Sequence, residues 1–159
     1  MILIRHGKAE KLTSGMHDFD RELTGAGRRE VKDAVAGIAL YIEPGSRVQV
    51  WTSPLTRARQ TARILADGLH RAALVEREEI PGGDLMGLAA YWGDMGEKDV
   101  VIIVGHEPYL SEWCNRLTGA ILPFKVASAA GIEMKDPHTL EGKLRWYAHP
   151  GILARLGER

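Results

Sequence analysis

The chain has 159 residues, with 21 basic and 21 acidic side chains, and 45% of the residues are hydrophobic. This length suits one domain over residues 1–159 that buries a core without disulfides. The balanced charge gives no electrostatic case for nucleic acid or an acidic membrane as a partner. The single cysteine, Cys114, excludes an intramolecular disulfide framework. No apolar run reaches membrane-spanning length or resembles a secretory leader, so we expect a cytoplasmic protein.

Strands and helices are predicted to alternate along the chain, because the period of the hydrophobic residues switches repeatedly. The predicted strands cover residues 1–4, 47–51, 74–75, 100–104, 129–134 and 143–149. The predicted helices lie within residues 23–42, 52–69, 85–95 and 105–117. Thr24 can cap the first of these helices, whereas Ser53 can cap the second with Pro54 at its first position.

The arrangement of these elements predicts an α/β fold. The apolar runs at 1–4 and 100–104 show no alternation, which is typical of central strands covered on both faces of a parallel sheet. The last two strands enclose a turn-forming segment and predict an antiparallel pair at one edge. We therefore expect a mostly parallel sheet with right-handed crossovers, helices on both sides and an antiparallel edge strand.

Ligands of such sheets bind beyond the carboxyl ends of the strands. The residues that follow the predicted strands at that edge are Arg5, His6, Gly7, Ser53, Arg57, Gly105, His106 and Glu107. Guanidinium groups match the oxygens of phosphate and stay charged at any working pH. Arg57 also lies in the first turn of its helix, where free backbone N–H groups add to the same field. The sequence thus predicts a phosphate site.

His6 is the candidate nucleophile of this site. Neighbouring cations disfavour an imidazolium, so we expect a lowered pKa for His6 and a neutral nitrogen that attacks phosphorus. Gly7 is expected to let an oxyanion approach the backbone beside His6. His106 can donate a hydrogen bond to a phosphoryl oxygen, while Arg5 and Arg57 offset the charge during transfer. Water then cleaves the phosphohistidine intermediate.

Metal and dinucleotide chemistry find less support in the sequence. The remaining histidines, at positions 17, 70, 138 and 149, have no ligand spacing, and no HExxH or cysteine-rich pattern is present. A metal-dependent hydrolase built on His6 and His106 would place the cation beside Arg5, which repels it. The stretch Gly25-Ala26-Gly27 lacks both the third glycine and the preceding strand of a dinucleotide loop.

The strings Arg5-His6-Gly7, Ser53-Pro54 with Arg57, and Gly105-His106 together resemble the histidine phosphatase superfamily. The segments DFDRELTGAG and TSPLTRARQTA are similar to its small SixA-type phosphohistidine phosphatases, and the resemblance spans residues 1 to about 135. It implies a three-layer α/β/α sandwich of the phosphoglycerate mutase-like type, with no metal or organic cofactor. It also implies a phosphorylated His6, a pocket formed by Arg5, Arg57 and His106, and Arg21 as a further substrate contact.

The acid that would protonate a leaving group has no clear place in the sequence. Larger mutase-like relatives carry it in a glutamate-glycine context that is not found here, and the nearest candidates by position, Glu79 and Asp84, are not counted as catalytic. Without such an acid, a phosphorylated imidazole suits the site better than a phosphate ester. The imidazole can leave as a neutral ring once its other nitrogen is protonated, whereas the ester would have to release an alkoxide. We therefore expect a phosphohistidine-bearing protein as substrate. The alternatives are a small phosphomonoester, such as a sugar phosphate or nucleotide, and a phosphate-binding module without turnover.

Overall fold

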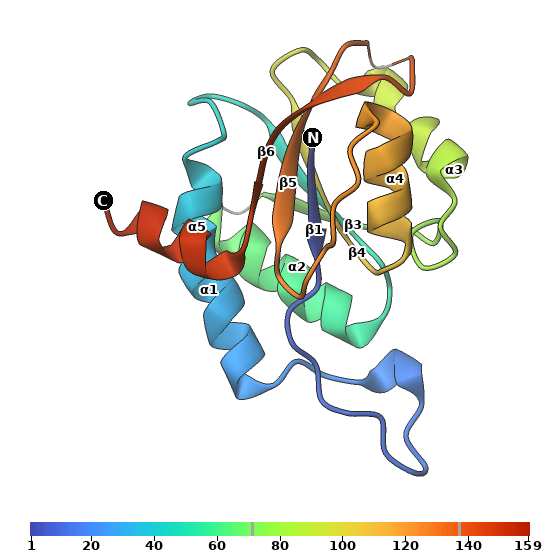
Figure 1. Ribbon diagram of the computed structural model, residues 1–159, viewed down its shortest axis with the longest axis vertical. Coiled ribbons are helices and arrows are strands. Elements are labelled where there is room, and N and C mark those ends of the chain that lie inside the picture. The colour runs from blue at the N-terminus through green and yellow to red at the C-terminus, as the bar shows by residue number, and fades with distance from the viewer. Residues whose placement is uncertain (71, 137) are drawn as a thin grey trace.

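A six-stranded sheet forms the centre of the computed structural model, which describes residues 1–70, 72–136 and 138–159 (Figure 1). Its strands are β1 (Ile2–Arg5), β2 (Val48–Thr52), β3 (Ala73–Glu76), β4 (Val100–Gly105), β5 (Ala129–Met134) and β6 (Gly142–Ala148). They lie in the order β3-β2-β4-β1-β5-β6. The first four run parallel, whereas β5 is antiparallel to both β1 and β6. The predicted α/β class is confirmed, with the antiparallel pairing at the β6 edge.

Helices cover both faces of the sheet. They are α1 (Gly25–Ala39), α2 (Thr56–Gly68), α3 (Leu85–Ala89), α4 (Tyr109–Thr118) and α5 (Pro150–Gly157), with short 3-10 helices η1 (Asp18–Asp20) and η2 (Trp92–Asp94). Successive residues of β1 point to opposite faces, as they must in a strand. Ile4 therefore packs against α1, α2 and α5, whereas Leu3 packs on the α3 and α4 side. This is the three-layer arrangement.

The two central strands end at the same level, which places the residues that follow them side by side. Arg5 of β1 pairs with Gly105 of β4, and Thr52 of β2 pairs with Val104. The buried apolar runs of β1 and β4 confirm the prediction of central strands. Because parallel strands share a direction, the segments after β1, β2 and β4 all leave the sheet at one edge.

Several predicted boundaries were wrong. The helix expected from Ser53 and Pro54 begins only at Thr56, because the Ser53 hydroxyl is bonded to His106 and accepts from the Leu55 amide instead of capping the helix. The helix predicted over 85–95 is divided into α3 and η2. Neither α5 nor η1 was predicted. The Thr24 cap is confirmed, since its hydroxyl accepts from the Gly27 amide.

The helices of the described part of the chain were compared with the length and hydropathy that a membrane span requires. None is long and apolar enough to cross a bilayer.

Candidate active site

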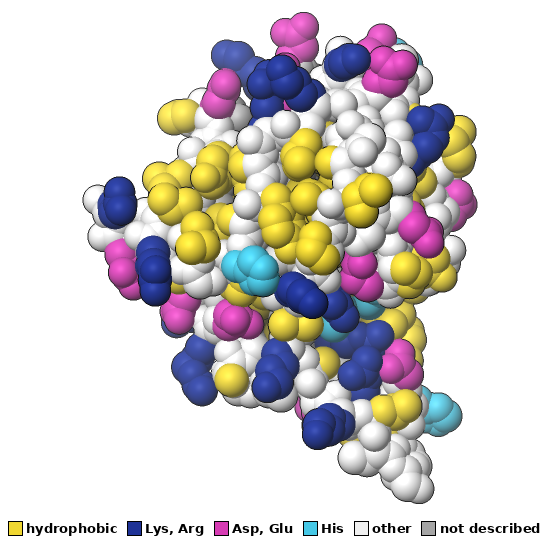
Figure 2. Space-filling view, in the orientation of Figure 1, with side chains coloured by type: hydrophobic (Ala, Val, Ile, Leu, Met, Phe, Trp, Pro, Cys, Tyr) yellow, Lys and Arg dark blue, Asp and Glu magenta, His cyan; other side chains and the backbone are white. Residues whose placement is uncertain are grey.

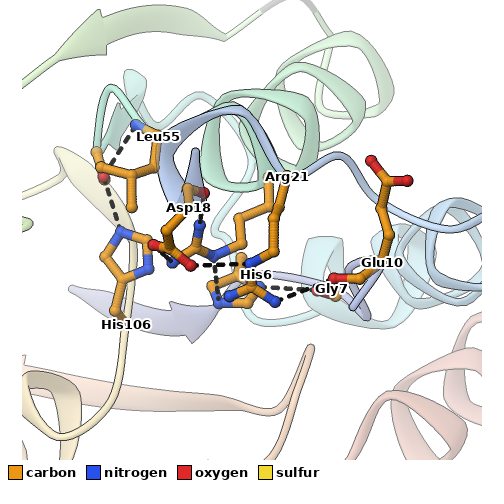
Figure 3. Close-up of polar contacts among 9 residues, drawn as sticks. His6, Gly7, Glu10, Asp18, Arg21, Leu55 and His106 are labelled. Carbon is orange, nitrogen blue, oxygen red and sulfur yellow. Dashed lines mark hydrogen bonds and ion pairs between the residues drawn. The ribbon is translucent and has the colours of Figure 1, made fainter. Parts of the chain in front are cut away.

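The two histidines that were expected at the carboxyl edge of the sheet meet there. His6 follows β1 and His106 follows β4, and the His6 amide donates to the Gly105 carbonyl at 3.2 Å. Their ring centroids lie 5.3 Å apart, and each residue is only 7% exposed. Figure 3 shows both rings facing the same space between the strand ends and the segment around Asp18.

The orientation of His6 leaves one ring nitrogen directed into the site. Its Nδ1 lies 2.8 Å from the Gly7 carbonyl oxygen, which can only accept, so Nδ1 carries the proton. Its Nε2 accepts from Arg57 Nε at 3.3 Å. Burial is the main reason why the pKa of His6 falls to about 3; the Gly7 bond opposes this shift, and His106, Arg57 and Arg5 add to it. The pKa is lowered, which is the expected direction, but burial contributes more to the shift than the cations do.

His106 is oriented through its Nε2, which lies 2.8 Å from Ser53 Oγ. Ser53 Oγ accepts from the Leu55 amide and can donate its own proton to Nε2, and in that tautomer the ring proton of His106 lies on Nδ1. Nδ1 is buried and has no partner among the described residues. Burial lowers the pKa of His106 to about 4, Arg57 and Arg5 lower it further, and Asp18 opposes them. In that tautomer the neutral ring has a free N–H donor for a ligand of the site.

The two arginines complete the ring of polar groups. Arg5 donates from one terminal nitrogen to the Phe124 carbonyl at 2.9 Å, and its Nε is buried without a partner in the described chain. Arg57 lies in the first turn of α2 with a side chain that is 8% exposed. Its two terminal nitrogens donate to the backbone oxygen and the carboxylate of Asp18, at 2.9 and 3.2 Å. These guanidiniums and imidazoles therefore lie at the same edge of the sheet, and groups of these types bind oxyanions in proteins.

The structure gives Gly7 a different role from the one expected from the sequence. Its amide donates to Thr61 Oγ1 at 3.0 Å and therefore does not face the site. A Cβ added at Gly7 would lie 2.8 Å from Val31 Cγ2, so the missing side chain makes room for α1 rather than for an oxyanion. The contribution of Gly7 to the site is its carbonyl, which orients His6.

Arg21 lies beside the site and holds the segment that leads into it. Its Nε donates to Asp18 Oδ1 at 2.9 Å, and a terminal nitrogen donates to the Glu10 carbonyl at 3.0 Å (Figure 3). Asp18, which sequence reasoning missed, thus contacts both Arg57 and Arg21. The only sequence signal for it was its place in the quoted segment DFDRELTGAG.

Glu79 and Asp84, the two carboxylates nearest by position to a leaving-group acid, form hydrogen bonds within their own segment. Glu79 accepts from the Tyr91 hydroxyl at 3.0 Å, and Asp84 caps α3 by accepting from the Gly87 amide at 2.8 Å. Within residues 1–70, 72–136 and 138–159, no group of three or more His, Cys, Asp or Glu side chains has a geometry that could hold a metal ion.

Several known proteins are similar to this chain in sequence or in fold. Residues 1–91 match the family model of the histidine phosphatase superfamily (branch 1). An uncharacterized protein of Picosynechococcus sp. is 32% identical over 83% of both chains. The structure of the protein histidine phosphatase SixA in complex with tungstate superposes with a TM-score of 0.77 at 25% identity, over 96% of this chain and 97% of that chain. A mycobacterial glucosyl-3-phosphoglycerate phosphatase with inorganic phosphate gives a TM-score of 0.63 at 16% identity, over 94% and 97%.

The chain belongs to the histidine phosphatase superfamily. Within that superfamily it is similar to the SixA type, which has the phosphoglycerate mutase-like fold described above. The protein is accordingly a phosphatase, which sets aside the phosphate-binding module without turnover.

Proposed function

We propose that the protein removes phosphate from phosphohistidine on another protein, through a phosphorylated His6. The observation that carries this proposal is the orientation of His6, whose Nδ1 is held by the Gly7 carbonyl while Nε2 faces Arg57. A neutral imidazole with an unprotonated nitrogen toward the oxyanion site is the form needed for nucleophilic attack on phosphorus. The lowered pKa of His6 keeps it in this form at neutral pH.

Each group of the site takes a defined part in the two steps. His6 Nε2 bonds to phosphorus while the bond from phosphorus to the substrate nitrogen breaks. Arg5, Arg57 and the Nδ1–H of His106 bind the phosphoryl oxygens, whose charge they offset during transfer. Water then attacks phosphorus, the bond to His6 Nε2 breaks, and inorganic phosphate leaves. Ser53 acts through His106, because a hydroxyl that donates to Nε2 favours the tautomer with the ring proton on Nδ1.

The charge state of Asp18, the carboxylate that contacts Arg57, favours a phosphoramidate substrate over an ester. Burial alone would raise the pKa of Asp18, but the guanidiniums of Arg57 and Arg21 outweigh it and lower the pKa below the usual value. Asp18 is therefore ionised near neutral pH and cannot serve as the acid for an alkoxide. A phosphorylated imidazole whose other nitrogen is protonated leaves as a neutral ring and needs no such acid.

A phosphorylated protein is thus the preferred substrate, and the likeness to the protein histidine phosphatase SixA supports this choice. A small phosphate ester is the second candidate, because a glucosyl-3-phosphoglycerate phosphatase shares the fold. The two candidates differ in kcat/KM, which reports the discrimination between substrates.

The experiment measures kcat/KM on a protein domain phosphorylated at histidine, on an aryl phosphate and on a hexose phosphate. We expect the phosphohistidine domain to be preferred by at least about 100-fold, equivalent to about 2.7 kcal/mol in transition-state binding. Exposed His17→Ala is the matched control for His6→Ala. A preference for the hexose phosphate contradicts the substrate assignment.

The covalent intermediate is tested separately. Incubation with radiolabelled substrate followed by denaturation is expected to trap an acid-labile, alkali-stable label in the wild type and in His17→Ala, but not in His6→Ala. Labelling that persists in His6→Ala contradicts the proposed nucleophile.

A further inference from the structure

We propose that Asp18 is a positioning residue for catalysis, which fixes the guanidinium of Arg57 in the orientation that faces a phosphoryl group on His6. The inference rests on the proposed function, in which Arg57 binds the phosphoryl oxygens. It assigns a role to a carboxylate that lies in the site without being an acid, a nucleophile or a metal ligand.

Asp18 occupies one edge of the Arg57 guanidinium through two different oxygens. The backbone oxygen accepts from one terminal nitrogen at 2.9 Å, and the carboxylate accepts from the other at 3.2 Å. The opposite edge, which carries Nε, points to His6 Nε2 at 3.3 Å. A guanidinium is planar, so fixing its outer edge also fixes the direction of the Nε edge. The donors of that edge then face the position of a phosphoryl group bonded to His6.

Asp18 is itself held in place by a second arginine. This distinguishes it from a mobile carboxylate that would compete with the substrate for Arg57. Its second carboxylate oxygen accepts from Arg21 Nε at 2.9 Å, and Arg21 is anchored to the Glu10 carbonyl at 3.0 Å. Figure 3 shows Asp18 between His106 and the Arg21 side chain, with Glu10 on the far side of Arg21. A continuous series of hydrogen bonds therefore links the segment before α1 to the α2 side of the site, through Glu10, Arg21, Asp18 and Arg57.

The burial of Arg57 explains why the contact contributes to function. The Arg57 side chain is 8% exposed, whereas that of Asp18 is 51% exposed. A buried guanidinium without a counter-group carries a desolvation penalty and turns toward any available acceptor. Asp18 offsets this penalty from the solvent side, which leaves the inner side of Arg57 available to substrate. The same carboxylate also partly counters the lowering of the His106 pKa by the arginines.

The test is a double-mutant cycle between Asp18 and Arg57, read by kcat, KM and the affinity for inorganic phosphate. Asp18→Ala removes the carboxylate contacts to both arginines but keeps the backbone contact. We expect kcat/KM to fall about 10- to 100-fold, the range for losing a hydrogen bond to a charged group, and phosphate to bind more weakly. In an Arg57→Ala background, the same Asp18→Ala change is expected to alter kcat/KM less than about twofold.

Matched variants separate positioning from folding. Asp18→Glu is expected to recover part of the lost activity, and the neighbouring exposed Asp20→Asn is expected to behave as the wild type. If Asp18→Ala unfolds, Asp18→Asn, which removes the charge at constant shape, takes its place in the cycle. Thermal unfolding identifies any variant that does not fold.

Three results would overturn the proposal. The first is an Asp18→Ala enzyme with unchanged kinetics and phosphate affinity. The second is tighter phosphate binding in that variant, which would make Asp18 a competitor of the substrate. The third is full additivity of the two substitutions. The proposed function fails in a different way, through a preference for the hexose phosphate or through a label that persists in His6→Ala, so the two failures are distinguishable.

Discussion

The two buried histidines of the site give the protein a specific sensitivity to acid. Unfolded histidine has a pKa of 6.5, whereas burial lowers the pKa to about 3 for His6 and about 4 for His106. Below pH 6.5 the unfolded chain binds protons that the folded chain does not, so the free energy of unfolding falls as pH decreases. The loss continues until pH reaches the folded pKa values of about 3 and 4.

We predict that replacing both histidines with asparagine reduces this acid sensitivity. The free energy of unfolding of the wild type is expected to fall more steeply between about pH 6.5 and about pH 4.5 than that of the His6→Asn/His106→Asn variant, by up to about 1.4 kcal/mol per pH unit for each histidine. Urea unfolding at several pH values measures both slopes. Replacing the exposed His17 and His149 is the control, and equal slopes for the site variant and the wild type would contradict the prediction.

Ser53 offers a second prediction at the level of single residues. Its hydroxyl lies 2.8 Å from His106 Nε2, and its removal releases the constraint that keeps the ring proton on Nδ1. We expect Ser53→Ala to lower kcat about 10-fold or more while KM changes little, because the lost donor acts mainly on the charge of the transition state. Nitrogen chemical shifts of His106 report the tautomer. Exposed Ser14→Ala is the control, and an unchanged Nδ1–H form in Ser53→Ala would contradict this role.

At the scale of elements, the sequence correctly predicted those helices and strands whose position depends on neighbouring residues in the chain. The unbroken apolar runs identified β1 and β4, and the Thr24 hydroxyl marked the start of α1. The start of α2 was misplaced, because the Ser53 hydroxyl is bonded to His106, a residue far away in the sequence. The helix α5 was missed because it depends on tertiary packing, since Leu153 is fully buried in the core shared with α1.

The packing of α5 on α1 depends on Gly37. A Cβ at this position would overlap the Leu153 carbonyl group, so the two helices approach through the missing side chain. We predict that Gly37→Ala destabilises the protein by about 1 to 3 kcal/mol, the usual cost of overpacking, although alanine is the better helix former. Gly25→Ala in the same helix meets only an ordinary contact and is the control. Urea unfolding measures both variants, and a Gly37→Ala protein as stable as Gly25→Ala would contradict the packing argument.

At the scale of the whole molecule, the site is identified by its chemistry and not by the size of a cavity. A cavity of about 590 Å³ lies elsewhere and is lined by residues such as Met1, Trp92, Val101 and Glu133. The rule for parallel sheets selected the other edge from sequence, and with it His6, His106 and Arg57. That rule says nothing of segments that fold back over the edge. Asp18 was missed for this reason, because its place beside Arg57 depends on the path of the chain between β1 and α1.

The distribution of charge predicts how the enzyme responds to salt. The net charge of the chain is zero, so no long-range field attracts an anionic substrate. Lys and Arg side chains nevertheless gather in the lower part of the face shown in Figure 2. Arg57, the best buried of the site's two arginines, acts at contact distance and is 6% exposed, where screening by ions is weak.

We therefore predict that kcat/KM for a small aryl phosphate changes less than about threefold between about 0.05 and about 0.5 M NaCl, although the Debye length shortens severalfold over this range. A phosphoprotein substrate that meets the exposed basic side chains around the site is expected to show a larger decrease, through KM and not through kcat. Kinetics on both substrates at constant pH measure the difference. A steep loss of kcat/KM for the aryl phosphate would show that the basic side chains act at long range despite the balanced net charge, which would contradict the contact mechanism.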